Sequence, residues 1–384
     1  MYNAASKRAE EFIDHEEILA SIQFAQENKD NRPYIESLIE RAADCKGLNH
    51  REAMTLLECE EPDLVERMFH LAREIKQKFY GNRIVMFAPL YLSNYCVNGC
   101  TYCPYHAKNK HIARKKLTQE EIRREVIALQ DMGIQHKNGA IRRVNVNIAA
   151  TTVENYRKLK EAGIGTYILF QETYHKENYE KLHPTGPKHD YAWHTEAMDR
   201  AMEGGIDDVG IGVLFGLNMY RYDFVGLLMH AEHLEAACGV GPHTISVPRI
   251  RNADDIDAST FENAISDELF AKIVAVIRIA VPYTGMIIST RESKTTREKV
   301  LDLGVSQISG GSRTSVGGYV EEEEENSAQF DVSDTSTLDE VVNWLLELGY
   351  IPSFCTACYR EGRTGDRFMT LVKSGQIANC CQPN

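Results

Sequence analysis

The chain has 384 residues, 43% of them hydrophobic and 26% charged, which is typical of a soluble globular protein with a sizeable core. Its formal net charge of −13 at pH 7 argues against a basic surface, so we expect no nucleic-acid partner. No apolar run reaches the length of a membrane span, and the first residues carry no apolar signal region. We therefore expect no membrane contact and a cytoplasmic location.

The first 80 residues show helical periodicity with polar connections, and they predict an N-terminal helical region, residues 1–80. The apolar run 84–92 then predicts a buried strand, and residues 117–133 predict a helix. Thr118 and Glu121 have the spacing of a capping box at the start of this helix, and Gly133 is expected to end it.

Strand and helix patterns alternate through the middle of the chain. The further expected strands are 141–148, 166–172, 209–215, 243–248, 285–289 and 306–309. Repeated βα units predict parallel strands with helical crossovers. We therefore expect an α/β fold, a TIM-type (β/α) barrel or partly open barrel over residues 81–320. Its chemistry should lie at the C-terminal ends of the strands.

The predicted barrel lacks one βα unit. Together with 84–92 the patterns give seven strands, whereas a closed barrel of this type has eight. Only seven residues separate Gly133 from Ile141, although another βα unit would need roughly 30. The acidic run 321–325 predicts a solvated loop, and it opens a C-terminal extension, residues 321–384, that carries a second cysteine cluster.

Three of the ten cysteines, Cys96, Cys100 and Cys103, crowd into the loop after the first expected strand. Thiolates suit zinc or iron–sulfur clusters. A structural zinc site needs four ligands, which His106 could complete. Three cysteines can instead hold three irons of a 4Fe–4S cluster and leave the fourth iron open for a substrate. Cys45, Cys59 and Cys238 stand alone in helical patterns and are expected to be buried apolar residues.

With Tyr102 before its last cysteine, this motif resembles the signature of the radical S-adenosylmethionine (SAM) enzymes. The resemblance implies that the open iron binds SAM, and that the reduced cluster cleaves SAM to methionine and a 5′-deoxyadenosyl radical. It also implies that Tyr102 lies against the adenine.

Longer stretches narrow the resemblance to the tyrosine lyases of this superfamily. They include residues 145–175, 183–201, 205–217 and 310–319, and the resemblance covers most of residues 80–384. One branch of these lyases acts in thiamine synthesis and the other in FeFe-hydrogenase maturation. The tail distinguishes them, because the maturation branch carries a motif like Cys355-x2-Cys358-x22-Cys381 on a second iron–sulfur cluster. By spacing alone, zinc fits this motif as well as a cluster does, with Cys380 as a possible fourth ligand.

The maturation branch implies a defined reaction. The radical removes hydrogen from the amino group of L-tyrosine, the Cα–Cβ bond breaks, p-cresol leaves, and the remainder becomes carbon monoxide and cyanide. An extra iron on the second cluster collects both, with free cysteine in the site. A protein histidine also binds that iron, and His233 and His243 both fit its place. A ferredoxin or flavodoxin is the implied electron donor, and other hydrogenase maturation proteins are implied partners.

The remaining site residues follow from positions at strand ends. Gln171 and Glu172 end one expected strand, and Glu172 is expected at the ribose of SAM. Arg249 is expected to pair with the SAM carboxylate. Arg291, whose planar fork suits a carboxylate, is expected to bind tyrosine with help from Ser289 and Ser309. Each of these could instead be a surface ion pair or a turn residue.

The absent βα unit leaves two other functions open. In the family its strand carries an acidic, glycine-containing stretch that holds the SAM amino group, and no such stretch occurs in this sequence. The chain could thus be a lyase of the thiamine branch whose tail holds a structural metal. It could also be an inactive, iron-binding scaffold.

Overall fold

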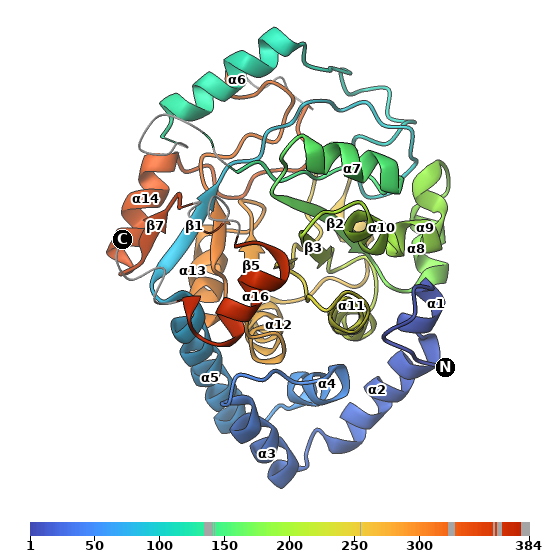
Figure 1. The fold of residues 1–384 in the computed structure, drawn as a ribbon, viewed down its shortest axis with the longest axis vertical. Coiled ribbons are helices and arrows are strands. Elements are labelled where there is room, and N and C mark those ends of the chain that lie inside the picture. Colours follow the sequence, from blue (N-terminus) through green and yellow to red (C-terminus); the bar gives the residue numbers. More distant parts are fainter. Residues whose placement is uncertain are drawn as a thin grey trace.

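The centre of the fold is one parallel sheet of seven strands (Figure 1). In a computed structural model of the chain, the described residues are 1–133, 141, 143–253, 255–321, 327–355, 358 and 363–377. The strands are β1 (Arg83–Phe87), β2 (Thr166–Glu172), β3 (Asp208–Val213), β4 (Thr244–Ser246), β5 (Gly285–Ile288), β6 (Gln307–Ser309) and β7 (Ile351–Ser353). They pair in parallel in the order β2-β3-β4-β5-β6-β1-β7. Because the two end strands have no pairing with each other among the described residues, the sheet is an open, partial barrel, which confirms the expected fold class.

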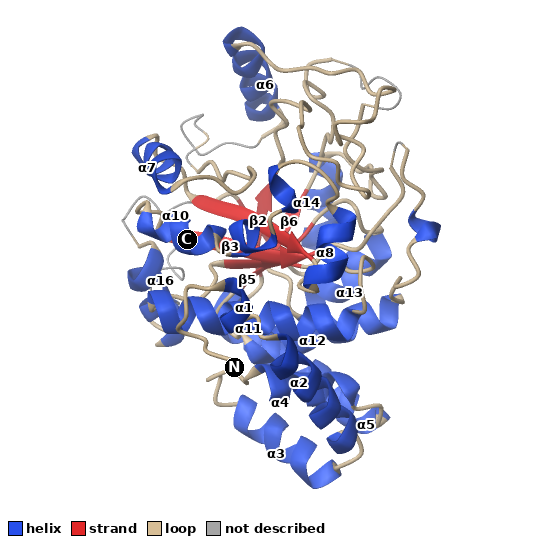
Figure 2. Cartoon of the chain, turned by 90° about the vertical axis from the view of Figure 1, so that its right-hand side faces the viewer, coloured by secondary structure: helices blue, strands red, loops and turns tan. Residues whose placement is uncertain are grey.

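Helices surround the sheet, and the N-terminal helices form a further layer on one side of it (Figure 2). That layer comprises α1 (Ala9–Phe12), α2 (His15–Asn28), α3 (Arg32–Ala42), α4 (His50–Glu58) and α5 (Pro62–Tyr80). The later helices are α6 (Gln119–Asp131), α7 (Val153–Glu161), α8 (Lys176–Leu182), α9 (Tyr191–Thr195), α10 (Ala197–Glu203), α11 (Tyr220–Cys238), α12 (Asp267–Ala280), α13 (Lys294–Leu303), α14 (Leu338–Glu347) and α16 (Gly365–Lys373), with 3-10 turns η1 (Pro187–His189) and η2 (Ala258–Thr260).

The core runs between the sheet and the N-terminal layer. In α12 every residue from Ile273 to Ala280 is buried, because α4 and α5 pack on it. A helix that is covered on several sides is apolar on most of its surface, and α12 has that composition. Arg278 is the exception within this run. Its guanidinium is fully buried, and it donates hydrogen bonds to the backbone oxygens of Pro282, Thr284 and Gly304 at 2.7–3.2 Å.

The strand expected at 141–148 is reduced to a single bridge, between Val146 and Tyr167 of β2. Backbone hydrogen bonds accompany it, including Val146 N to Thr166 O at 2.9 Å and Ile168 N to Val146 O at 3.0 Å. Residue 142 lies outside the described part of the chain. The segment has β2 on one side, whereas an interior strand needs a partner on both. The absent βα unit would have supplied the second one.

Several other strand bounds differ from expectation, and one strand was not expected at all. The first strand ends at Phe87 and not at residue 92, and Pro89, which has no backbone N–H to donate, follows closely. The unexpected β7 pairs with β1, with Ile351 opposite Arg83. Its middle residue is Pro352, which a sheet accepts only at an edge. The seven observed strands are therefore not the seven expected ones.

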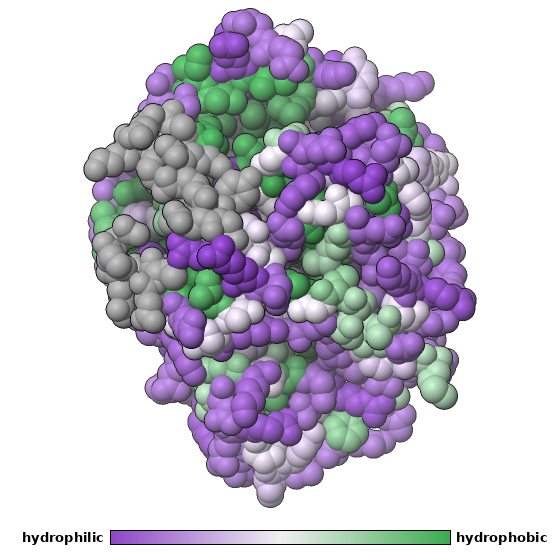
Figure 3. Space-filling model, in the orientation of Figure 1, coloured by the Kyte–Doolittle hydropathy of each residue, from purple (hydrophilic) through white to green (hydrophobic). Residues whose placement is uncertain are grey.

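Apolar surface is exposed beside α6. Figure 3 shows hydrophobic side chains gathered beneath this helix, at the top of the view. The capping box of Thr118 and Glu121 is present as expected, yet only Glu125 and Leu129 of α6 are buried. Ile127 is 48% exposed. In a repeated βα fold the next unit would cover this face, so the position of the uncovered surface agrees with the absence of that unit.

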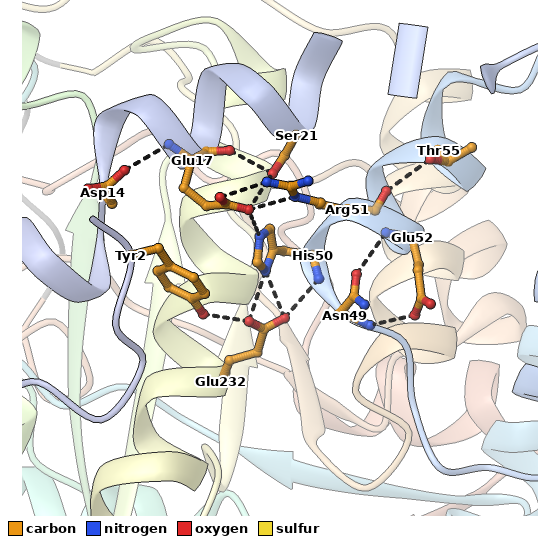
Figure 4. A network of polar contacts seen from close by, with 10 residues as sticks. All are labelled: Tyr2, Asp14, Glu17, Ser21, Asn49, His50, Arg51, Glu52, Thr55 and Glu232. Carbon is orange, nitrogen blue, oxygen red and sulfur yellow. Dashed lines mark hydrogen bonds and ion pairs between the residues drawn. The ribbon is translucent and has the colours of Figure 1, made fainter. Parts of the chain in front are cut away.

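A network of polar side chains joins the N-terminal layer to the barrel (Figure 4). His50, the first residue of α4, lies between carboxylates of Glu17 in α2 and Glu232 in α11, with both ring nitrogens within 3.0 Å of an oxygen. Tyr2 donates its hydroxyl to Glu232 at 2.7 Å, and Arg51 donates to Glu17. No helix within the described ranges is both long enough and apolar enough to cross a membrane.

Candidate functional site: a cysteine loop at the carboxyl ends of the strands

The loop after β1 is organised around one guanidinium. Arg114 donates hydrogen bonds, at 2.5–3.1 Å, to the backbone oxygens of Asn94, Tyr105, His106 and Asn109. A guanidinium offers five donors in a fixed plane, so a single side chain can satisfy several carbonyls that turn toward one centre. This arrangement holds together the two ends of the segment that carries the three cysteines.

The three thiols of this loop are neighbours. Cys100 is buried, Cys96 and Cys103 are partly buried, and none is in a disulfide. Burial raises the pKa of Cys100 to about 12, and the charges of Cys103 and Cys96 add to that rise. Burial likewise raises the pKa of Cys103, with a contribution from Cys96. Three buried or partly buried thiols that affect one another form a donor set of the kind that soft metal centres take.

This donor set fits an iron–sulfur cluster. The loop offers three soft thiol donors that are not in disulfides. In a cubane each cysteine binds a different iron, so three thiolates hold three irons and leave the fourth iron open. His106, which could complete a zinc site, lies with its Nε2 3.6 Å from Asp255 Oδ2. Cys96, Cys100 and Cys103 would hold the cluster.

Tyr102 is buried in this site, and its orientation is fixed by hydrogen bonds. The Nδ1–H of His183 donates to the Tyr179 backbone oxygen at 2.7 Å, so Nε2 of a neutral ring is left to accept. The Tyr102 hydroxyl donates to that Nε2 at 2.8 Å. Burial, together with the charge of Lys188, lowers the pKa of His183 to about 4, which keeps the ring neutral.

The two residues at the end of β2 have different surroundings. Gln171 is buried and donates to the Thr195 hydroxyl at 2.9 Å, so its amide faces α9. Glu172 follows a bulge and has a φ of +71°, which turns its side chain toward the cysteine loop. There its carboxylate accepts a hydrogen bond from Lys188 Nζ at 2.7 Å.

The carboxyl ends of β4 and β5 carry two arginines with contrasting partners. Arg249 is buried in a network with Glu292, which is 1% exposed, and with Asp267 at 2.7 Å. Arg291 lies with its guanidinium carbon 4.0 Å from the centre of the Phe330 ring. Burial lowers its pKa, and opposing charges include those of Glu172 and Cys103. Arg291 therefore shares one site with the ribose-binding candidate and the cysteine loop.

The serines near Arg291 bind the backbone. Ser289 Oγ accepts from the Arg291 backbone N–H at 3.3 Å. Ser309 Oγ accepts from the Thr290 N–H at 3.2 Å, and its carbonyl oxygen accepts from Arg297 at 2.5 Å. Ser289 shapes the turn that presents Arg291, whereas Ser309 links the ends of β5 and β6.

The opposite, amino-terminal mouth of the sheet holds His243. Its ring is partly buried and lies 4.9 Å from the Phe368 ring of α16. Its Nδ1 lies 3.4 Å from Asp208 Oδ1, and its Nε2 lies 3.4 Å from an Arg143 guanidinium nitrogen. Burial lowers its pKa to about 4, against the attraction of Asp208. The first backbone N–H of α16, at Gly365, donates to Asp208 at 2.9 Å. α16 is therefore fixed at this mouth, where it lies in front of the strands (Figure 1).

The other candidates for this mouth differ in position. His233 is fully buried in α11 with both ring nitrogens engaged, Nδ1 with the Ala4 carbonyl at 2.7 Å and Nε2 with Asp199 at 3.0 Å. It also stacks on Phe12, with ring centres 3.7 Å apart. Cys355 is exposed and Cys358 partly buried, while Cys380 and Cys381 lie outside the described residues.

Comparisons with known proteins agree with this geometry. A family model described as the Biotin and Thiamin Synthesis associated domain matches residues 246–351. A crystal structure of HydG, a maturase of the FeFe-hydrogenase, superposes with a TM-score of 0.91 at 54% identity, over 96% of this chain and 86% of that one. HydG from Carboxydothermus hydrogenoformans gives 0.83 at 39% identity, over 95% of this chain and 88% of that one. A 2-iminoacetate synthase of Salmonella typhimurium is 30% identical over 339 residues, 82% of this chain and 89% of the relative.

The protein is a radical SAM enzyme. Its sheet is an open parallel α/β sheet, three thiols lie together after the carboxyl end of β1, and the relatives described above have the same class of fold. Within that class, the chain belongs to the HydG family of radical SAM tyrosine lyases. Membership implies a 4Fe–4S cluster and SAM as cofactors, and the cysteine loop described above fits both.

Sequence reasoning missed three residues of this site. Lys188, His183 and Arg114 all bind the cysteine loop or its tyrosine. Lys188 and His183 stand about 80 residues beyond the cysteines, outside the strand ends where candidates were sought. The stretch HPTGPK, in which a glycine and two prolines precede Lys188, was the available signal of a tightly turned segment.

Proposed function

We propose that this chain, acting in the cytoplasm, cleaves the Cα–Cβ bond of L-tyrosine to release p-cresol, and that the glycine-derived remainder becomes carbon monoxide and cyanide for FeFe-hydrogenase maturation. One observation carries the substrate assignment. The Arg291 guanidinium makes no hydrogen bond among the described residues, yet it lies on the Phe330 ring close to Cys103 and Glu172. A desolvated, planar cation beside the cluster loop suits the carboxylate of an aromatic amino acid.

In this proposal the site residues bind SAM and L-tyrosine and orient them. When bound, the cluster and SAM supply the 5′-deoxyadenosyl radical. Tyr102, which His183 holds in place, is the residue proposed for the adenine, and Glu172, whose φ is +71°, is the residue proposed for the ribose. Arg291 would bind the tyrosine carboxylate, with Ser289 holding the Arg291 backbone, and this contact would fix the orientation of the substrate. Arg249 supports this mouth through Glu292, and a role at the SAM carboxylate would require it to leave that pair.

The amino-terminal mouth is the proposed place of the second cluster and its extra iron. Cys355, Cys358 and Cys381 are the proposed ligands of the cluster. His243 is the better candidate for the iron, because α16, which follows Cys358 in the sequence, packs against it. His233 has both nitrogens occupied elsewhere. We also propose that free cysteine forms part of this second site. The proposed electron donor is a ferredoxin or flavodoxin, and the proposed protein partners are other hydrogenase maturation proteins.

A single anaerobic assay tests the proposal. The chain is reconstituted with iron and sulfide, reduced with dithionite, and given SAM and L-tyrosine. We expect 5′-deoxyadenosine and p-cresol in step, followed by carbon monoxide and cyanide, all above the background of a Cys100→Ala variant. Absence of both first products, with the cluster intact by electron paramagnetic resonance, would refute the lyase and favour an iron-binding scaffold.

A second candidate is the activity named for the 30% identical relative, a 2-iminoacetate synthase. In that case the tail would hold a structural metal only. The same assay separates the two, because p-cresol would then form without carbon monoxide or cyanide.

A further inference from the structure

The segment of residues 182–189 is docked on the cysteine loop. Two backbone hydrogen bonds of 2.9 Å join them, from the Gly99 N–H to the Thr185 oxygen and from the Thr101 N–H to the Leu182 oxygen. These bonds flank Cys100 on both sides. The position of the segment is therefore set by the same loop that carries the thiols.

A glycine and an asparagine bring the two backbones together. Gly186 has a φ of +91°, and a Cβ there would lie 2.5 Å from Asn98 Oδ1. Only glycine allows this approach without strain. The same Asn98 Oδ1 accepts a hydrogen bond from the Lys188 backbone N–H at 2.9 Å. The main chain of Lys188 is thus anchored to Asn98, which lies midway between Cys96 and Cys100 in the sequence.

The ammonium group of Lys188 enters the site itself. It donates to Glu172 Oε1 at 2.7 Å and to the Tyr102 hydroxyl oxygen at 3.0 Å. Its side chain is 14% exposed, so these bonds are largely shielded from water. The Tyr102 hydroxyl in turn donates its hydrogen bond to His183 Nε2, so the hydrogen bonds run from Lys188 through Tyr102 to His183. One cation thereby orients both residues expected to touch SAM.

The positive charge of Lys188 is held at the cysteine loop by contacts on both sides of Cys100. Its ammonium group donates to the hydroxyl of Tyr102, which stands between Cys100 and Cys103 in the sequence. Its backbone N–H donates to Asn98, which stands between Cys96 and Cys100. Cys100 and Tyr102 belong to one buried cluster, and Cys103 packs against it.

We propose that Lys188 is a positioning and charge-compensating residue of the first cluster: it favours the reduced cluster electrostatically, and it holds Glu172 and Tyr102 in the orientation that receives SAM. This rests on the cluster site proposed above. A cubane held by three thiolates is negatively charged, and its charge grows by one unit on reduction. A fixed cation nearby therefore raises the reduction potential.

The test measures the midpoint potential of the reconstituted full-length protein by a redox titration monitored by electron paramagnetic resonance, without SAM or tyrosine. We expect Lys188→Met to shift the midpoint to more negative values and Lys188→Arg to restore most of the shift. Glu172→Gln, which removes the opposing charge with little change of shape, should shift the midpoint the other way. Lys181→Met, an exposed lysine of α8, is the matched control and should match the unmodified protein.

The outcomes are distinct from those of the tyrosine assay. Opposite shifts in Lys188→Met and Glu172→Gln support the proposal even if no p-cresol is formed. A Lys188→Met cluster that assembles with an unchanged midpoint overturns it. If Lys188→Met fails to take up iron, Glu172→Gln decides, and a zero or negative shift there overturns the proposal.

Discussion

The imidazole of His50 lies with its Nδ1 2.8 Å from a carboxylate oxygen of Glu232, and this contact ties the N-terminal layer to α11 (Figure 4). On its other side Nε2 lies 3.0 Å from Glu17. A carboxylate can only accept, so both ring nitrogens donate and the ring is a cation. Burial opposes this charge, but the hydrogen bonds and charges of the two carboxylates outweigh it and raise the pKa of His50.

A pH-dependent stability follows from this contact. A pKa raised in the folded state gives stabilisation that is complete below the unfolded value of 6.5 and is lost as pH rises through the folded value. We expect His50→Gln to lower the free energy of unfolding by about 1–3 kcal/mol at pH 6 and by less at pH 9. Urea unfolding at both pH values measures this. His70→Gln, an exposed histidine of α5, is the control, and an equal loss at both pH values would contradict the prediction.

The pair of Arg249 and Glu292 supports a second prediction, on the stability of the carboxyl-end mouth. Glu292 is 1% exposed and also accepts from Arg251. Glu292→Gln keeps the shape but leaves the buried Arg249 guanidinium with only the half-exposed Asp267 as a carboxylate partner, so we expect a loss of about 3–5 kcal/mol. Asp267→Asn, at the half-exposed end of the network, should cost at most about 1 kcal/mol. Similar urea midpoints for the two variants would show that Glu292 does not stabilise the buried arginine.

Much of the sheet was predictable because buried parallel strands read as short apolar runs. The strand at 166–172 was predicted with its observed bounds, and Glu172 was placed at its end. The hydrophobic pattern failed to predict strands where the neighbouring strands in the sheet decide whether a segment can pair. Residues 141–148 alternate like a strand, but the described residues among them form a single bridge, from Val146 to Tyr167 of β2. Ile351–Ser353 contains a proline, which argues against a strand until its edge position is known.

The site was predictable in part for a related reason. The motif of Cys96, Cys100 and Cys103 can be recognised from the spacing of its cysteines in the sequence alone. Lys188 reaches that loop from a distant segment, through a turn that only the folded backbone makes visible. Position at a strand end likewise made Arg249 and Arg291 equally good candidates for binding a carboxylate. Their burial partners separate them, because one is engaged by Glu292 and the other is not.

Arg291 provides a third prediction, on substrate binding. We expect Arg291→Lys to lower kcat/KM for tyrosine about 10- to 100-fold, mainly through KM, because a point charge replaces a planar fork worth about 1.5–3 kcal/mol. The midpoint potential of the cluster should change little by comparison. Steady-state p-cresol formation measures the effect, and Arg73→Lys on the surface of α5 is the control. An unchanged KM would remove Arg291 from the tyrosine site.

The last prediction separates the two histidines proposed for the extra iron. His243 faces α16 at the amino-terminal mouth, whereas both nitrogens of His233 are engaged by Ala4 and Asp199. We expect His243→Gln to lower the iron content of the reconstituted chain and to abolish cyanide capture, while p-cresol still forms. His233→Gln should keep its iron but unfold at lower urea concentration, because it removes the imidazole that contacts the buried Asp199 carboxylate and stacks on Phe12. Iron analysis beside urea unfolding distinguishes these results, and loss of iron from His233→Gln alone would reverse the assignment.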